Sequence, residues 1–391
     1  LKRGAAVVCV DENSDYVQAV LDPQWDPALE AAEREMAEQL YGEIRGLDEV
    51  TVLLPVTRYV VERSGSLVDL AKFYYDSCLR RLFSGFIDGD PKYAREGDAA
   101  VIRLRVGREE RRIVVVPYAL NSRALGDQLA HLYPYFTERA REGLAKLLLL
   151  ISSEEKRRDL LQEMKNALSQ RTGMKRAQEV ERLLSSPTPL LGDLVRVLEI
   201  IHSDEWQVQG IGGRGTRSIS AWRQLCHRVG VHTATLENIL DGLKSLDGMG
   251  IFDVVLEGRL VKEPDADSFV RGGKLAVLDL NFLNVERERS QLMQRAKKIL
   301  TLRLLNRLVA WKDAKEGTPF TLVVVDEAHR FFPRAVEEGK EYVEYVGGEL
   351  ERIARIGRVR GLGLLLSTHS PKDVHTSVLN LCNTKVIFRL D

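Results

Sequence analysis

The segment 321–333, TLVVVDEAHRFFP, constrains the fold more than any other part of the 391-residue chain. Four consecutive apolar residues, 322–325, lead directly into two carboxylates, Asp326 and Glu327. A continuous apolar run without polar alternation is typical of a strand buried on both faces of a parallel sheet. The carboxyl ends of such strands meet the crevice where α/β folds bind ligands. The segment therefore predicts a parallel sheet that presents Asp326 and Glu327 at its ligand-binding edge.

The chain after residue 272 alternates strand and helix patterns around this segment. Short apolar runs predict strands, and apolar residues spaced three or four apart predict helices. The predicted order is strand, helix, strand, helix, strand, strand, at 273–280, 286–311, 321–325, 348–360, 361–370 and 384–390. This alternation implies right-handed crossovers and a parallel sheet flanked by helices.

The first 250 residues contain a part with strands and a helical part. Strands are predicted at 5–10, 50–61 and 99–118, and an acidic, solvated helix is predicted at 26–49. The pattern is almost wholly helical from 152 to 250, so we interpret 136–250 as a helical insertion domain. This domain would interrupt an α/β core formed by 1–135 and 251–391, and a chain of this length can contain two or three such units.

Composition excludes several classes of protein. Lys and Arg total 57 and Asp and Glu total 57, so any nucleic-acid contact must come from local basic patches. The four cysteines are far apart and form no CxxC pair, which argues against a disulfide framework and against a zinc site. The apolar run at 144–151 is too short to span a membrane and contains Lys146. We therefore expect a cytoplasmic protein without a membrane partner.

Asp326 and Glu327 are the residue types that ATP hydrolysis requires at a strand end. An Asp there can hold Mg²⁺ through water, and a neighbouring Glu can polarise the attacking water. The alternative is structural, because an acidic residue after a strand often caps the next helix. Two adjacent acids after four strand formers, with a second strand ending in polar residues soon afterwards, favour the ATPase interpretation.

The next strand and the helix before it carry further candidates. Strand 361–370 ends in polar residues that include Thr368 and His369, which could sense the γ-phosphate, although a lone His is more often structural. Arg352, Arg355 and Arg358 recur every three residues and therefore lie along one side of a helix. They form either an ordinary solvated face or a source of an arginine finger that reaches a neighbouring subunit's nucleotide.

No phosphate-binding loop of the form GxxxxGK[ST] occurs in the sequence. The nearest pattern, GIGGRGTRS at 210–218, has Thr216 where the Lys must stand and follows no strand. We interpret it as a surface loop in which Arg214 and Arg217 could contact DNA phosphates. Cys226, His227 and His232 suggest a metal site only weakly, because no fourth ligand lies in range.

Together these motifs resemble the HerA family of hexameric DNA translocases and helicases, within the HerA/FtsK group of RecA-like ATPases. The resemblance rests on LVVVDEAHRFFP, ERIARIGRVRGLGLLLSTHSPKDV and LNLCNTKVIFRL, and more weakly on GKLAVLDLNFLN and VVCVDENSDY. In the last segment the family pattern is Asp-Pro-His-Gly-Glu-Tyr. Asp11 and Tyr16 match it, whereas Asp15 replaces the Glu. The likeness is strong over 272–391, fair over 1–16 and 114–125, and weak in the helical insertion.

The resemblance implies a RecA-like fold and roles for individual residues. Asp326 would organise Mg²⁺, Glu327 would activate water, and Asp11, Thr368 and His369 would face the nucleotide. His369 stands where relatives often have Gln. Arg358 would be the first choice for an arginine finger acting between subunits, and Arg355 the second. The resemblance further implies ATP and Mg²⁺ as cofactors, a homo-hexamer around double-stranded DNA, and a NurA-like nuclease as partner in end resection.

The same register explains the missing phosphate loop. In HerA-like chains this loop and its helix come directly before the strand that here begins near Ala5. We therefore expect the loop to lie upstream of Leu1, and we expect this stretch alone to bind ATP poorly. Two alternatives remain open. One is a DNA pump closer to FtsK or to the conjugative coupling proteins, and the other is a non-hydrolysing DNA-binding ring that lost its phosphate loop.

Overall fold

The computed structural model describes residues 4–22, 35–36, 38–39, 45–169, 174–210, 220–334, 340–369, 372 and 374–387. The side chains of some helical residues, including that of Arg358, lie outside this description. The chain divides into two compact units. Unit 1 contains Leu1–Ala119, Val255–Glu338 and Val346–Asp391, and unit 2 contains Leu120–Val254 and Gly339–Tyr345.

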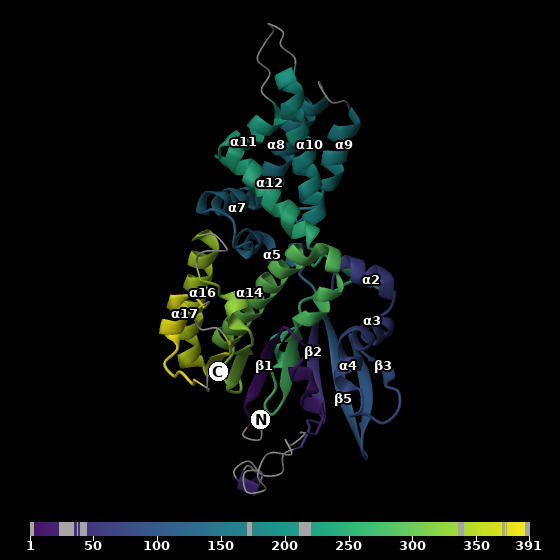
Figure 1. Cartoon of the computed structure of the whole chain (residues 1–391). Helices are drawn as coiled ribbons and strands as arrows, with labels where there is room; N and C mark the ends of the chain where they lie inside the picture. Colours follow the sequence, from purple (N-terminus) through teal and green to yellow (C-terminus); the bar gives the residue numbers. More distant parts are fainter. Residues whose placement is uncertain are drawn as a thin grey trace. The chain divides into compact units, whose positions relative to one another are not determined.

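Unit 1 is built on an eight-stranded sheet (Figure 1). Its strands are β1 (Ala6–Asp11), β2 (Glu49–Pro55), β3 (Lys92–Glu96), β4 (Ala99–Val106), β5 (Glu109–Tyr118), β8 (Leu275–Asp279), β9 (Thr321–Val325) and β10 (Leu362–Leu366). The spatial order is β10-β9-β1-β8-β2-β5-β4-β3. The first six strands in this order run parallel, and β4 and β3 join antiparallel at one side. The sheet is mixed but mostly parallel and is flanked by helices, consistent with the predicted RecA-like α/β fold.

Central strands of this sheet are mostly apolar because both of their faces are covered. All five residues of β8 are buried, as are five of the six in β1 and four of the five in β9. Full coverage removes the polar alternation that a half-exposed strand would show. The edge strand β3 is polar and mostly exposed, and no sequence pattern predicted it.

The parallel register brings several strand ends to one edge of the sheet. Asp11 at the end of β1 lies opposite Asp279 at the end of β8. On the other side of β1, Val10 lies opposite Val325, the last residue of β9, and Leu366 of β10 also lies opposite Val325. The residues that follow β9 and β10 therefore reach the same carboxyl edge as Asp11 and Asp279.

Helices of unit 1 cover and extend the sheet. They are α2 (Arg58–Ser64), α3 (Leu67–Tyr74), α4 (Arg80–Phe83), α13 (Ala266–Phe269), α14 (Ser290–Ala314), α15 (Ala328–Phe331) and α17 (Thr376–Leu381). Helix α3 packs against β4 and β3. Helix α14 is buried along much of its length and encloses even Lys297 and Lys312. Helix α16 (Lys340–Arg360) contains residues of both units.

Unit 2 consists of helices. They are α5 (Ser122–Leu125), α6 (Leu129–Leu132), α7 (Glu138–Ser152), α8 (Glu154–Ser169), α9 (Met174–Leu183), α10 (Leu191–Gly210), α11 (Ala221–Val229) and α12 (Thr233–Gly248). Helix α11 is capped at its start by Ser220, whose side chain accepts a hydrogen bond from the backbone N–H of Arg223, and is followed by the left-handed Gly230. Trp222 is fully buried in the core of this unit. Gly242 of α12 packs on Phe136, where an added Cβ would lie 2.0 Å from the ring.

Most predicted elements are confirmed, with three corrections. The predicted strand at 50–61 ends at Pro55, because Thr57 caps α2 by accepting a hydrogen bond from the backbone N–H of Val60. The helix predicted at 348–360 begins earlier, at Lys340. Residues 384–387 of the predicted last strand form no strand, and Val386 and Ile387 are exposed. An apolar segment becomes a strand only where a neighbouring strand pairs with it.

Most of the predicted acidic helix at 26–49 lies outside the described residues, and Glu49 itself begins β2. Within the described part of the chain, no helix is both long enough and apolar enough to span a membrane.

Candidate active site

Asp326 and Glu327 lie at the carboxyl end of β9, between β1 and β10. The backbone N–H of Asp326 donates to the carbonyl of Val10, 3.1 Å away, which ties this residue to β1. On the other side, the N–H of Ala328 donates to the carbonyl of Ser367 at 2.8 Å. The structure therefore places both residues at the carboxyl edge of the parallel strands, as predicted.

Glu327 has an unusual backbone conformation. Its φ of 49° and ψ of 44° are left-handed, and a non-glycine residue adopts this region at a cost of about 1 kcal/mol. Ser14, with φ of 66°, is a second such residue in the loop after β1. Backbone strain of this kind is held in place by surrounding structure and often occurs at functional sites.

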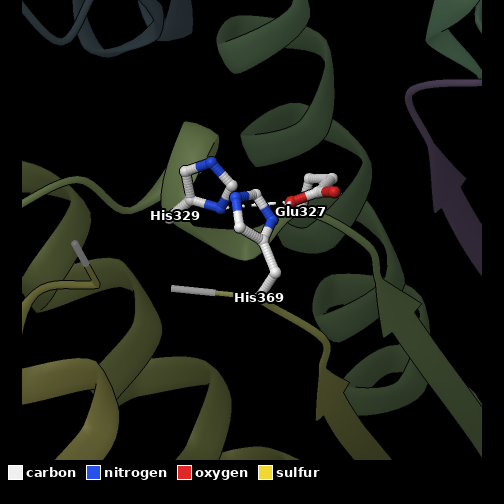
Figure 2. A group of neighbouring side chains, drawn as sticks. All are labelled: Glu327, His329 and His369. Carbon is white, nitrogen blue, oxygen red and sulfur yellow. Dashed lines mark hydrogen bonds and ion pairs between the residues drawn. The ribbon is translucent and has the colours of Figure 1, made fainter. Parts of the chain in front are cut away.

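Two histidines contact the Glu327 carboxylate. Nδ1 of His369 lies 2.9 Å from Oε2 of Glu327, and Nδ1 of His329 lies 3.2 Å from the same oxygen (Figure 2). The two imidazole rings are 4.7 Å apart and nearly perpendicular. Thr368 adds a contact of 3.2 Å from its Oγ1 to Nδ1 of His329. Glu327 is 22% exposed, so its carboxylate is held by imidazoles yet remains reachable by water.

Asp11, the last residue of β1, is completely buried at the same edge of the sheet. Its two carboxylate oxygens accept the backbone N–H groups of Asn13 at 2.9 Å and of Tyr16 at 2.7 Å, which shapes the turn after β1. Burial raises the pKa of Asp11 to about 6, and these hydrogen bonds oppose the rise. Carboxylate oxygens of Asp11, Asp15 and Asp326 all lie within 4.8 Å of one another.

The cluster of three carboxylates, Asp11, Asp15 and Asp326, has the donor chemistry of a magnesium site. Mg²⁺ prefers oxygen ligands and usually keeps several waters, so one or two carboxylates suffice to hold it. Asp326 and Asp15 suit this role better than Asp11, whose oxygens already accept two backbone hydrogen bonds. A bound Mg²⁺ would supply charge neutralisation for a phosphate group at this edge.

Asp279 is a second fully buried carboxylate at the edge. It accepts hydrogen bonds from the Tyr74 hydroxyl and, at 3.0 Å, from the backbone N–H of Asn281. Asn281 in turn donates to the Ser14 hydroxyl at 3.0 Å. Burial, and then the nearby Asp11, raise the pKa of Asp279 to about 7.

Glu12 is buried as well but has a cationic partner. The ammonium of Lys297, on α14, donates to Oε2 of Glu12 at 2.8 Å, and both side chains are only 1% exposed. The partly exposed Arg330 donates to the same oxygen at 3.2 Å. This contact ties the loop after β1 to α14 and to the end of α15.

The predicted arginines have different positions. Arg355 is exposed and pairs with Glu351 at 2.7 Å on its own helix. Arg352 contacts Glu349 and, at 2.6 Å, Oδ1 of Asn306. The side chain of Arg358 lies outside the described residues, as do Arg214 and Arg217. In the described part of the chain, Cys226, His227 and His232 form no metal-ligand group.

Sequence reasoning missed three residues that the structure brings to this edge. His329 follows Glu327 by two positions in the quoted motif but was not singled out. Asp279 ends an apolar run in the same way as Asp11, and this shared pattern could have indicated it. Glu12 gave no signal, because its partner Lys297 is far away in the sequence.

Comparisons with known proteins give two local matches. The chain is 37% identical over 70 residues to a probable helicase of Methanocaldococcus jannaschii, which covers 18% of this chain and 12% of that protein. It is 41% identical over 76 residues to the probable DNA double-strand break repair helicase HerA of the same organism, covering 19% of this chain and 14% of that protein. No family model matches. The likeness is thus to two probable helicases, one of them named HerA, over short segments.

Proposed function

We propose that this protein is the motor of an ATP-driven DNA translocase or helicase of the HerA type. The supporting observation is the placement of Asp326 and Glu327 at the carboxyl edge of a RecA-like sheet, beside the carboxylates of Asp11 and Asp15. The local likeness to two helicases supports the same activity. A strand-end Asp followed by Glu, next to further carboxylates, suits hydrolysis of the phosphoanhydride bond of ATP better than it suits simple helix capping.

Each side chain has a distinct task in this proposal. Asp326, with Asp15, holds the Mg²⁺ that accompanies ATP. Glu327 accepts a hydrogen bond from the attacking water and orients it toward the γ-phosphate. His369 and His329 hold the Glu327 carboxylate in place through Oε2, and its other oxygen faces the water. Thr368 orients the His329 ring and completes the polar end of β10.

The assembly that we propose is a homo-hexamer around double-stranded DNA. Arg358 and the exposed Arg355 lie on α16, where a guanidinium could reach a neighbouring subunit's nucleotide and stabilise transition-state charge. A NurA-like nuclease and a role in end resection are part of the same proposal. Their support is the likeness to a protein named as a double-strand break repair helicase.

The test is the substitution Glu327→Gln in the native protein. The amide keeps the size of the side chain but polarises water poorly, so ATP turnover should fall by at least about 100-fold, the scale of general-base catalysis. Nucleotide binding, measured with a fluorescent ATP analogue, should change little. The matched control is Glu155→Gln, an exposed Glu on α8 of unit 2, which should leave turnover near that of the wild type.

Unchanged turnover in Glu327→Gln would remove Glu327 from the mechanism. If wild-type protein binds DNA but hydrolyses no ATP, a non-hydrolysing ring becomes the better assignment. An active wild-type protein that pumps DNA without separating strands would favour the FtsK-like or conjugative coupling type.

A further inference from the structure

A cluster of ligand atoms at the ends of β9 and β10 has not been given a role of its own. Glu327, His329 and His369 each offer one ligand atom, and these atoms lie within 4.8 Å of one another (Figure 2). All three residues belong to unit 1 and come from two adjacent parallel strand ends. Counting cysteines predicted no zinc site, but two imidazoles and a carboxylate are also a common set of metal ligands.

Two separations between ligand atoms of this cluster fit a single metal ion. Bonds of about 2.0–2.1 Å from a metal to N and O ligands place neighbouring ligand atoms about 2.9–3.4 Å apart in tetrahedral or octahedral geometry. Oε2 of Glu327 lies 2.9 Å from Nδ1 of His369 and 3.2 Å from Nδ1 of His329. Both separations fall in this range, so an ion that bound all three side chains would replace the Glu327–His369 hydrogen bond and the His329–Thr368 hydrogen bond.

The cluster is also held in a fixed arrangement before any ion binds. Hydrogen bonds from Ala328 to Ser367 and from Ser367 to Val325 fix the two strand ends next to each other. The Thr368 hydroxyl, 3.2 Å from Nδ1 of His329, orients that ring. His369 is 69% exposed, so an ion can enter from solvent and keep water in its remaining coordination positions.

We propose that Glu327, His329 and His369 bind one divalent transition-metal ion, with Zn²⁺ as the best fit to the ligands. Imidazole suits Zn²⁺, Co²⁺ and Ni²⁺, whereas Mg²⁺ and Ca²⁺ take oxygen ligands. The site is therefore chemically distinct from the cluster of three carboxylates formed by Asp11, Asp15 and Asp326. The bound metal ion coordinates Oε2 of Glu327 and thereby reduces the basicity of this carboxylate.

One consequence of binding rests on the proposed function. If Glu327 activates water for ATP hydrolysis, an ion bound to it should inhibit turnover while Mg²⁺ and ATP still bind. The site would then make hydrolysis sensitive to the free concentration of transition-metal ions. Metal binding itself does not depend on that function, because it needs only the three side chains.

The direct test is Zn²⁺ titration of the protein without nucleotide, followed by calorimetry, with Co²⁺ absorption as a second measurement. We expect one tightly bound ion per chain at this site. His369→Gln should weaken binding by at least about ten-fold, since even outer partners of metal ligands have effects of that size. The Gln can still hydrogen-bond Glu327, and the side chain at this position is 69% exposed, so the substitution should leave the fold intact.

Matched variants show whether the bound ion lies at this cluster or elsewhere on the chain. His227→Ala removes an exposed His of unit 2 and should leave the affinity unchanged. The proposal is overturned if His369→Gln and His329→Ala both bind Zn²⁺ like the wild type, or if bound Co²⁺ shows the strong near-ultraviolet absorption of a thiolate ligand. The three side chains would then be a hydrogen-bonded cluster only.

Zn²⁺ inhibition of ATP turnover tests the consequence separately. In the wild type, inhibition should follow occupancy of the site, and in His369→Gln it should require at least about ten-fold more Zn²⁺. Binding without inhibition would confirm the metal site and contradict the role proposed for Glu327. Inhibition that is equal in both proteins would place the inhibitory ion elsewhere and count against this site.

Discussion

Two groups of side chains, each containing carboxylates or a carboxylate, lie at the same edge of the sheet in different surroundings. The β9–β10 group is Glu327 with His329 and His369, where the carboxylate is partly exposed and contacts two imidazoles. The β1–β8 group is Asp11, Glu12 and Asp279, which are almost completely buried. Burial raises the pKa of Asp11 and Asp279, whereas Glu12 is paired with Lys297.

The difference shows that position on a strand does not by itself decide what a carboxylate does. Strand β1 is central, so Asp11 at its end and Glu12 directly after it are enclosed, and their charge must be neutralised by a proton or a cation. Strands β9 and β10 are closer to the side of the sheet, and their ends face solvent. We therefore expect the buried group to determine stability and the partly exposed group to determine chemistry.

The largest expected effect on stability comes from Lys297→Met. This substitution leaves Glu12 buried without its ammonium partner, and breaking a buried ion pair in this way typically costs about 3–5 kcal/mol. Arg330 still contacts Glu12, so the loss should lie near the lower end of that range. Urea denaturation at neutral pH measures it.

An exposed pair in the same unit supplies the control. Lys274 lies 3.4 Å from Glu49 with its side chain about half exposed, and Lys274→Met should cost less than about 1 kcal/mol. The double variant Glu12→Gln with Lys297→Met should recover much of the stability lost by Lys297→Met alone. If Lys297→Met costs no more than Lys274→Met, burial does not distinguish the two groups in the way described above.

A smaller effect, dependent on pH, is expected for Asp279→Asn. The pKa of Asp279 is raised from 3.8 to about 7, so the folded state binds its proton more tightly than the unfolded state does. The resulting stabilisation is complete below about pH 4 and is lost as the pH rises through 7. The Asn side chain is uncharged at every pH in this range and does not titrate. Relative to wild type, Asp279→Asn should therefore gain about 2–3 kcal/mol between pH 5 and pH 8.

Tyr74→Phe sharpens the same experiment. The Tyr74 hydroxyl donates to the Asp279 carboxylate and lowers its pKa against the effect of burial. Removing the hydroxyl should raise this pKa further and move the loss of stability to higher pH. Denaturation midpoints measured at several pH values show the shift, and a pH profile that is the same in all three proteins would assign the titration to another group.

The sequence predicted the parts of this edge that depend on local patterns. The apolar run before Asp326 identifies a covered strand, and the strand's end determines where Asp326 and Glu327 lie. It did not predict α2, because Val60 and Val61 continue a β-branched pattern past Pro55 that is typical of a strand, although Thr57 caps a helix there.

Contacts between distant residues were beyond such reasoning. The position of Asp279 next to Asp11 follows from the insertion of β8 between β1 and β2, and helix–strand alternation does not fix that order. His329 meets Thr368 and His369 only because β9 and β10 are neighbours in register. A strand order has to be known before such side chains can be assigned to one site.

The smallest effect on stability is expected for His369→Ala, in the partly exposed group. Its ring is mostly in solvent and contacts a carboxylate that is itself accessible, so the free energy of unfolding should change by less than about 0.5 kcal/mol. Urea denaturation of His369→Ala and of Lys297→Met, measured under the same conditions, compares the two groups directly. A cost above about 1.5 kcal/mol would mean that His369 mainly holds Glu327 in its strained, left-handed backbone conformation. A change within 0.5 kcal/mol, together with the loss of Zn²⁺ affinity expected for substitutions at His369, would separate ligand binding from folding at this edge of the sheet, because only a ligand-binding role predicts both results.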